Sequence, residues 1–140
     1  MKHPLLSLLS AIVLSGGASA ATLTIELEGV EARGGSLYIS VQTEAQFMKD
    51  EGTAGEIVDA PQAGTFSATY DVPEGRYAVS IWHDDNGNGS FDTGGPFGMP
   101  EDGWAMHNSA ALLGPPTFEA TSVEVTSDGA IISEKMIYGR

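Results

Sequence analysis

The segment Thr22-Leu23-Thr24-Ile25-Glu26-Leu27-Glu28 alternates apolar and polar side chains without a break. Successive side chains of a β-strand point to opposite faces of a sheet, so a period of two residues is typical of a strand. An amphipathic helix would instead place its apolar residues three and four positions apart. The segment therefore predicts a half-buried β-strand with its leucine and isoleucine side chains inside.

The same alternation returns along the chain between residues that favour turns. Further strands are predicted over residues 37–41, 66–70, 76–82, 118–125 and 130–138. Pro73-Glu74-Gly75 is typical of a tight hairpin joining two neighbouring strands, and Asp128-Gly129 marks the turn before the last strand. Only residues 44–51 predict a short helix, with Phe47 and Met48 on its buried side.

Short strands with little helix predict an all-β fold, a single antiparallel β-sandwich with about six to seven strands and an Ig-like architecture. Residues 21–140 have the length of one domain with one hydrophobic core. The sequence contains no cysteine, which excludes disulfides, thiol nucleophiles and zinc-thiolate sites. Residues 83–116 show almost no strand or helix period, and we expect them to form one long irregular loop.

The N-terminus has the organisation of a secretory signal peptide. Lys2 and His3 precede an apolar run over residues 5–14, and Ala18-Ser19-Ala20 matches a small-residue cleavage site. The apolar run is too short to span a bilayer as a helix. We therefore expect cleavage after Ala20 and a periplasmic or secreted mature chain over residues 21–140, without a membrane span.

Acidic residues dominate the charge of the chain. The formal net charge is −13, from 19 Asp and Glu against 6 Lys and Arg. Binding to nucleic acid or to anionic lipid requires clustered basic side chains, so nucleic acid is excluded as a partner. The same surface attracts cations, although acidity by itself also serves solubility.

The segment Asp84-Asp85-Asn86-Gly87-Asn88-Gly89-Ser90-Phe91-Asp92 carries oxygen-bearing side chains at alternating positions. With Asp84 as position 1 of a calcium loop, positions 1, 3, 5, 6 and 9 have suitable residues, whereas position 12 is Gly95 instead of glutamate. Asp85, Glu101 or Asp102 would have to replace the missing ligand. The predicted Ca²⁺ ligands are Asp84, Asn86, Asn88, the Ser90 carbonyl, Asp92 and Asp102.

Two other interpretations of this loop remain open. Aspartate, asparagine and glycine also form turns held by side-chain to backbone hydrogen bonds, without any ion. His83 and His107, with a carboxylate such as Asp84 or Asp102, would suit a transition metal, and Met99 and Met106 would suit copper. This second interpretation corresponds to a small periplasmic metalloenzyme or transition-metal-binding protein.

Aromatic residues cluster around the same loop. Trp82, Phe91, Phe97 and Trp104 either pack beneath it or form a surface that faces a glycan or a peptide. A G-x-S-x-G nucleophile motif and a glycine-rich phosphate loop are both absent from the sequence. The sequence therefore favours a protein that is not an enzyme.

Several motifs resemble a bacterial family of exported proteins, catalogued as domain of unknown function 2141. The matching segments are Gly75-Arg76-Tyr77-Ala78, His83-Asp84-Asp85-Asn86-Gly87-Asn88-Gly89 with Asp92, Phe97-Gly98-Met99-Pro100, Asn108, and Pro115-Pro116-Thr117-Phe118. The chain departs from the family pattern at Asp102, Ala105 and His107, where glutamate, glycine and serine are usual. The resemblance implies an exported, prealbumin-like β-sandwich and no established activity.

Taken together, the sequence predicts a non-enzymatic module whose Ca²⁺-binding loop organises a surface for an envelope protein or a glycan. The alternative is the transition-metal protein that uses His83, His107 and nearby carboxylates.

Overall fold

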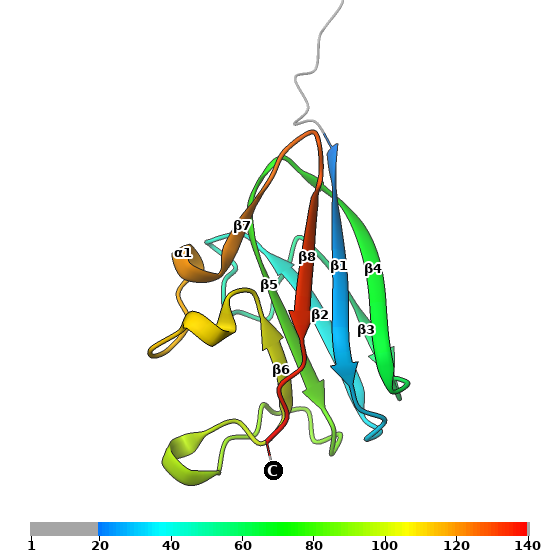
Figure 1. Cartoon of the computed structure of the whole chain (residues 1–140), viewed down its shortest axis with the longest axis vertical. Helices are drawn as coiled ribbons and strands as arrows, with labels where there is room; N and C mark the ends of the chain where they lie inside the picture. Colours follow the sequence, from blue (N-terminus) through cyan, green and yellow to red (C-terminus); the bar gives the residue numbers. More distant parts are fainter. Residues whose placement is uncertain (1–19, 140) are drawn as a thin grey trace, which may run out of the picture.

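The computed structural model describes residues 20–139, in which eight strands form two sheets packed face to face (Figure 1). The three-stranded sheet has the order β4 (Gly64–Pro73), β1 (Ala20–Val30), β8 (Ala130–Lys135). The five-stranded sheet has the order β3 (Ala54–Asp59), β2 (Ser36–Gln42), β5 (Gly75–Asp84), β6 (Gly103–Met106), and β7 (Ser122–Val125) also pairs with β5. The all-β sandwich is confirmed, with more strands than predicted.

The alternating segment 22–28 lies in β1, the central strand of the three-stranded sheet. Leu23, Ile25 and Leu27 are fully buried, whereas Glu26 and Glu28 are exposed. β1 pairs antiparallel with β4 and parallel with β8. The expectation of a purely antiparallel sandwich is therefore wrong for one pair. The last turn moves the chain from one sheet to the other, so β8 runs in the direction of β1.

The Pro73-Glu74-Gly75 turn does not form the predicted hairpin. β4 pairs with β1, whereas β5 pairs with β2, β6 and β7 in the opposite sheet. The turn is an arch between the two sheets, which Figure 1 shows at the end of the molecule where β4 leads into β5. Proline and glycine favour a tight reversal in either case, and only the pairing distinguishes a hairpin from an arch.

Residues 44–50 form turns and bends instead of the helix predicted over residues 44–51. The buried Gln42 side chain organises them: its Nε2 donates to the carbonyls of Lys49 and Glu51, and its Oε1 accepts from the Met48 N–H. Met48 has a positive φ of 58° and is 64% exposed, so it does not lie on a buried side. The turns satisfy the buried amide, which a helix in this place would leave without these partners.

The remaining differences concern short elements. Residues 118–121 form a single turn of helix, α1 (Phe118–Thr121), because the Thr117 hydroxyl accepts a hydrogen bond from the Ala120 N–H at its start. The strand predicted over residues 118–125 is therefore limited to residues 122–125, which form β7. The predicted loop 83–116 contains β6 and two 3₁₀ turns, η1 (Pro96–Gly98) and η2 (Ser109–Ala111).

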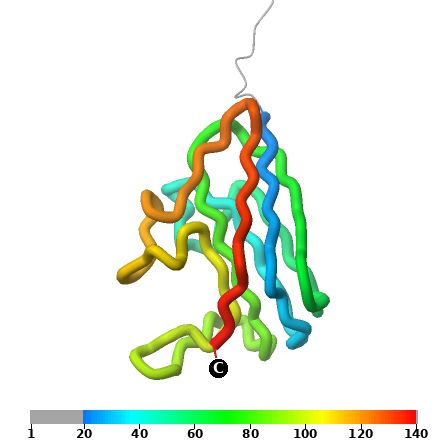
Figure 2. The backbone as a smooth tube through the Cα atoms, in the orientation of Figure 1, coloured from blue at the N-terminus to red at the C-terminus, as the bar shows by residue number. Residues whose placement is uncertain are grey.

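The two sheets meet along one edge. Beyond β8, Ile137 exchanges backbone hydrogen bonds of 2.8 and 2.9 Å with Trp104 of β6. The C-terminal segment thereby runs beside the loop that carries residues 93–101 (Figure 2). None of the helices in the described part of the chain has the length and apolar character needed to cross a membrane. The predicted leader over residues 1–20 lies outside the described residues except for Ala20, where β1 begins.

Candidate functional site

The motif that begins at Asp84 is a compact turn built on the end of β5. The Asp84 carboxylate is 2% exposed, and its two oxygens accept the N–H groups of Asn88 at 3.1 Å and Gly89 at 2.8 Å. Gly87 and Gly89 have φ values of 68° and 76°, which glycine adopts without a steric penalty. Asp84 therefore closes the turn around its own side chain.

Asp92 lies on the other side of this turn. The Asn86 and Asn88 amides donate to the same Asp92 oxygen, at 2.6 and 2.8 Å. Their own oxygens accept the N–H groups of Asn88 and Ser90. Two carboxylates and two amides thus meet within one turn, and Asn88 contacts both carboxylates.

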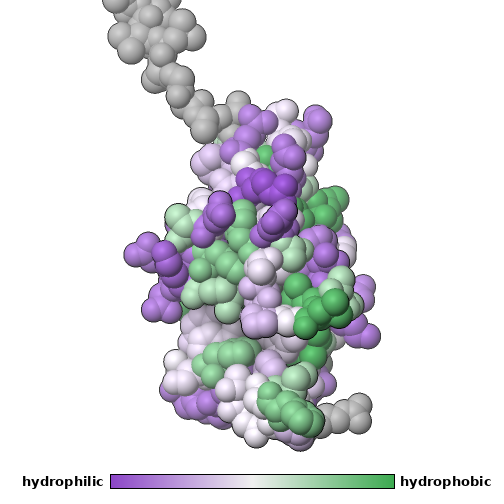
Figure 3. Space-filling view, turned by 90° about the vertical axis from the view of Figure 1, so that its left-hand side faces the viewer, coloured by the Kyte–Doolittle hydropathy of each residue, from purple (hydrophilic) through white to green (hydrophobic). Residues whose placement is uncertain are grey.

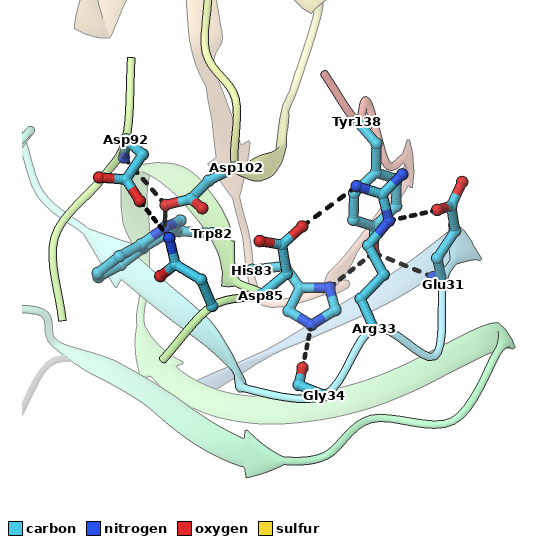
Figure 4. A network of polar contacts seen from close by, with 10 residues as sticks. Glu31, Arg33, Gly34, Trp82, His83, Asp85, Asp92, Asp102 and Tyr138 are labelled. Atoms are coloured by element: carbon cyan, nitrogen blue, oxygen red, sulfur yellow. Dashed lines mark hydrogen bonds and ion pairs between the residues drawn. The ribbon is translucent and has the colours of Figure 1, made fainter. Parts of the chain in front are cut away.

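Asp102 lies behind this group and joins it to the sheet. The side chain is 1% exposed, and one oxygen accepts the indole N–H of Trp82 at 2.8 Å and the backbone N–H of Asp92 at 3.0 Å (Figure 4). Asp102 and Asp92 therefore lie close together, but the Asp102 carboxylate contacts the backbone N–H of Asp92 and not its side chain. Glu101 joins this group through its backbone, since its N–H donates to the Asp92 carbonyl at 2.8 Å, whereas its carboxylate makes no hydrogen bond to the group within residues 20–139.

The donor set suits a hard cation chemically. Carboxylate and amide oxygens are the ligands that Ca²⁺ prefers, and the two carboxylates match its charge. The asparagine amides would have to turn, since their nitrogens now face Asp92. Among residues 20–139, no group of three His, Asp or Glu side chains could hold a metal ion, so amide and backbone oxygens are essential to any site in this turn.

His83 occupies a separate, fully buried position at the other side of β5. Its Nε2–H donates to the Gly34 carbonyl at 2.7 Å, and its Nδ1 accepts the Tyr138 hydroxyl at 2.8 Å (Figure 4). Burial raises the pKa of Tyr138, which keeps the phenol protonated as a donor. Both ring nitrogens are therefore engaged within the protein.

His83 and His107 do not lie together. Gly103 is opposite His83, and His107 is four residues farther along, so about 13 Å separates them at about 3.3 Å per residue. The structure therefore does not bring together the predicted pair of histidines with a shared carboxylate. His107 instead has Nδ1 at 3.3 Å from Oε1 of Glu134.

Sequence reasoning missed Glu134. It is 7% exposed and points to the same side of β8 as the buried Ile132. Burial raises the pKa of Glu134 to about 7. The sequence contained a signal for this position. In the predicted strand, Glu134 is two residues after Ile132, so the alternation places it on the same buried face.

Arg33 covers the network around His83 from outside. Its guanidinium lies 4.4 Å from the centre of the Tyr138 ring and pairs with Glu31 and, at 3.2 Å, with Asp85. The hydrogen bond to Glu31 raises the pKa of Arg33 further. Asp85, a predicted substitute ligand, is thereby directed toward Arg33 (Figure 4).

Apolar side chains form a continuous row across the outer face of the five-stranded sheet. Register places its members opposite one another on adjacent strands: Ile57, Tyr38, Trp82, Trp104 and Ile137. We call these five residues the outer row. The Tyr38 and Trp82 rings stack at 4.7 Å, and Phe91 meets Trp82 edge-on at 6.2 Å. Of the predicted aromatic platform, Trp82, Phe91 and Trp104 are therefore brought together.

The outer row leads into an apolar groove of about 250 Å³. Its lining includes Pro96, Met99, Trp104 and Ile137, with Glu101 as the only carboxylate among the described residues that line it. Phe97 is fully exposed at the turn η1 beside the groove. On the face drawn in Figure 3, apolar atoms gather in several patches among polar ones rather than in one continuous area.

Comparison with curated proteins and with solved structures finds no significant match. One family model matches residues 25–133 of this chain. That span contains β2 to β7 complete, the 84–92 turn and Asp102. The chain therefore belongs to the bacterial family described as "Uncharacterized protein conserved in bacteria (DUF2141)".

Proposed function

We propose that this protein is an exported, non-enzymatic module whose 84–102 segment binds Ca²⁺ and thereby orders an apolar surface for a partner at the cell envelope. The proposal rests on hydrogen bonds that connect the 84–92 turn to the outer row. The Asp102 carboxylate accepts both the Asp92 N–H and the indole N–H of Trp82, the central member of the outer row. An ion that fixes the turn would fix Asp92, and through Asp102 it would fix the Trp82 side chain at the middle of the row.

The proposed ligands are Asp84, Asn86, Asn88, the Ser90 carbonyl and Asp92. Asp102 contributes by holding Asp92 in place, since its Oδ2 accepts the Trp82 indole N–H and the Asp92 N–H. Five protein ligands are fewer than the six to eight oxygens that Ca²⁺ takes, so water completes the coordination. A site with two carboxylates and an exposed turn belongs with the weak extracellular sites, with a Kd on the order of 10⁻⁴ to 10⁻³ M.

The proposed partner is a protein segment that places an apolar side chain in the groove and a basic one beside Glu101. The groove is lined mainly by apolar side chains, and the chain has a net charge of −13. Complementary charge both speeds and orients such an association. A glycan is less well suited, because the Tyr38 and Trp82 rings stack on each other instead of presenting one flat surface.

Export is supported by the leader-like composition of residues 1–20. Expression of the whole gene in a Gram-negative host should release a periplasmic product that begins at Ala21. Mass spectrometry of the purified protein tests this, and a cytoplasmic product that retains residues 1–20 would contradict it.

The calcium proposal is tested by thermal unfolding with Ca²⁺ or with EGTA. A ligand that binds only the native state stabilises it, by about 2.7 kcal/mol at a concentration of 100 Kd. The chain has two tryptophans, Trp82 and Trp104, both in the outer row, so their fluorescence should respond to Ca²⁺ as well.

Asp84→Asn and Asp92→Asn should each remove the Ca²⁺ response. Asp85→Asn is the matched control, because it makes the same charge change in the same turn while its carboxylate pairs with Arg33. An unfolding temperature that is indifferent to Ca²⁺ in the wild-type protein would overturn the calcium site.

Partner binding is tested by titrating tryptophan fluorescence with short peptides. A peptide with leucine flanked by lysines should bind more tightly than one with leucine flanked by glutamates, and Ca²⁺ should strengthen the binding. Met99→Asn should weaken it, because it places a polar amide in the apolar groove lining without adding a charge that would attract the lysines. Binding of a soluble oligosaccharide instead of either peptide would assign the surface to glycans.

A further inference from the structure

Strand β4 forms one edge of the three-stranded sheet, and its side away from β1 is open (Figures 1 and 2). β4 pairs with β1 alone, and within residues 20–139 no backbone hydrogen bond outside that ladder reaches residues 64–72. An open edge presents a row of N–H and C=O groups that can pair with another strand. Residues 64–72 therefore offer a place for one more strand.

β4 lacks most of the features by which proteins protect such an edge. Edge strands are commonly short, carry lysine or proline, or contain inward-pointing charges. β4 is ten residues long, its proline is the last residue, and its only charged side chain is the exposed Asp71. The neighbouring edge strand β3, joined to β4 by the hydrogen bond from Tyr70 to Glu56, has six residues, of which Glu56 and Asp59 are charged. β4 is therefore the less protected of the two edges.

We propose that β4 pairs antiparallel with β4 of a second copy of this chain, which joins two three-stranded sheets into one sheet of six strands. A two-fold axis perpendicular to the sheet relates the copies. Such an axis keeps both inner faces on the same side, and residues opposite each other in a ladder lie on the same face. Inner residues must then oppose inner residues, so the register has to be centred on a residue.

The register centred on Ala68 suits the inner face of β4. Phe66, Ala68 and Tyr70 are half-buried there, and this register places Phe66 of each copy opposite Tyr70 of the other. Aromatic pairs opposite each other stabilise a ladder. Pro73, which has no N–H to donate, lies beyond the last pair, so every residue of the shared ladder can take part.

The outer face and the charge of the chain favour the same register. Its exposed pairs across the copies are Ser67 with Thr69 and Thr65 with Asp71, which can hydrogen-bond through their hydroxyl groups. Residues 60–70 contain no charged side chain, so the centre of the pairing is free of direct repulsion although each copy has a net charge of −13. Salt screens the repulsion that remains, so the dimer should strengthen as ionic strength rises.

Pairing through β4 leaves the apolar groove open in each copy. The groove is lined by Trp104 and Ile137 at the β6 edge, whereas β4 lies beside β3 at the opposite edge of the sandwich. The dimer therefore carries one groove at each end, and a partner with two apolar segments can bind both with increased avidity. The pairing itself requires neither calcium nor a partner, so it is independent of the proposed function.

The first test is sedimentation equilibrium of the purified protein at concentrations up to about 1 mM, where a monomer–dimer equilibrium is expected. Ser67→Glu should weaken the dimer by about tenfold or more, because it places two carboxylates diagonally across the axis. Ser133→Glu is the matched control and should dimerise as the wild type does. Ser67 and Ser133 flank Glu26 on either side, so both changes place a carboxylate opposite Glu26, but Ser133 lies on β8, away from the open edge.

The second test reads the register by disulfide cross-linking, since the chain has no cysteine of its own. Residues opposite each other in an antiparallel pair have Cα atoms about 4.5 or 5.5 Å apart, which a disulfide can span. Ala68→Cys should therefore form a covalent dimer under mild oxidation. Thr65→Cys is the control: it is more exposed, but its counterpart in the second copy lies six residues along the strand, about 20 Å away.

The results that contradict the pairing are specific. A protein that stays monomeric at the highest concentration, or a dimer that Ser67→Glu leaves intact, would overturn the proposal. Cross-linking of Thr65→Cys as efficient as that of Ala68→Cys would overturn the register.

Discussion

The Tyr138 hydroxyl donates a hydrogen bond to Nδ1 of the fully buried His83 at 2.8 Å. The same hydroxyl accepts the Glu31 N–H at 3.0 Å. One phenol thus joins the segment after β8 to the end of β5 and to the segment after β1. This contact closes the end of the sandwich where the candidate calcium turn begins.

Tyr138→Phe should destabilise the protein by about 1 to 3 kcal/mol, because it leaves the buried Nδ1 of His83 without a donor. Urea unfolding followed by tryptophan fluorescence measures the change. Tyr38→Phe is the control, since the Tyr38 hydroxyl makes no hydrogen bond within residues 20–139, and its effect should be small. Equal stability of the two variants would contradict a role for the Tyr138 hydroxyl.

Asp102 and Trp82 should be energetically coupled. A hydrogen bond to a charged group contributes about 1.5 to 3 kcal/mol, and the Asp102 carboxylate receives the Trp82 indole N–H at 2.8 Å. In a double-mutant cycle of Asp102→Ala and Trp82→Phe, the combined loss should therefore be smaller than the sum of the single losses. Additive losses would show that the indole contact contributes little.

The stability of the protein should depend on pH through Glu134. Its folded-state pKa of about 7 lies above the ordinary value of 4.5. The folded state therefore binds the proton more tightly, and this contribution, fully present below about pH 4.5, is lost as pH rises through 7. The shift from 4.5 to about 7 corresponds to a loss of about 3 kcal/mol.

Glu134→Gln isolates this effect, because glutamine has nearly the same shape and does not ionise. In metal-free buffer, the variant should gain stability relative to the wild type between pH 5 and pH 8. Urea unfolding at the two pH values gives the difference. A wild-type profile parallel to that of the variant would show that burial does not raise the pKa of Glu134.

Gly103→Ala should disturb the packing around Tyr138. A Cβ atom at this position would lie 2.3 Å from Cε1 of Tyr138, so the ring must shift from the position in which its hydroxyl reaches His83. We expect a loss of about 1 to 3 kcal/mol, the usual cost of overpacking. Gly114→Ala, which meets no atom within 4 Å, is the control, and thermal unfolding of both variants measures the effect.

The strands with strict alternation could be predicted because one face of each is buried. β1, β2 and β5 follow that pattern, and their predicted inner residues form the core. β3 and β6 were missed because neither shows a clean alternation: β3 is a largely exposed edge strand, and β6 is only four residues long. The prediction of a helix over residues 44–51 was wrong because apolar periodicity describes only the local sequence. It does not include the backbone hydrogen bonds that the buried Gln42 side chain makes with this segment.

The sequence by itself determined the fold class, the motif and its oxygen donors, since alternation and turn residues act locally along the chain. Only the tertiary structure decided that Asp102 bonds to Trp82, that His83 faces Tyr138, and that Glu134 lies beside His107. These pairs are separated by 20 to 55 residues. Their contacts arise from strand order and from the sheet that each strand joins, and a turn motif such as Pro73-Glu74-Gly75 carries no information about either.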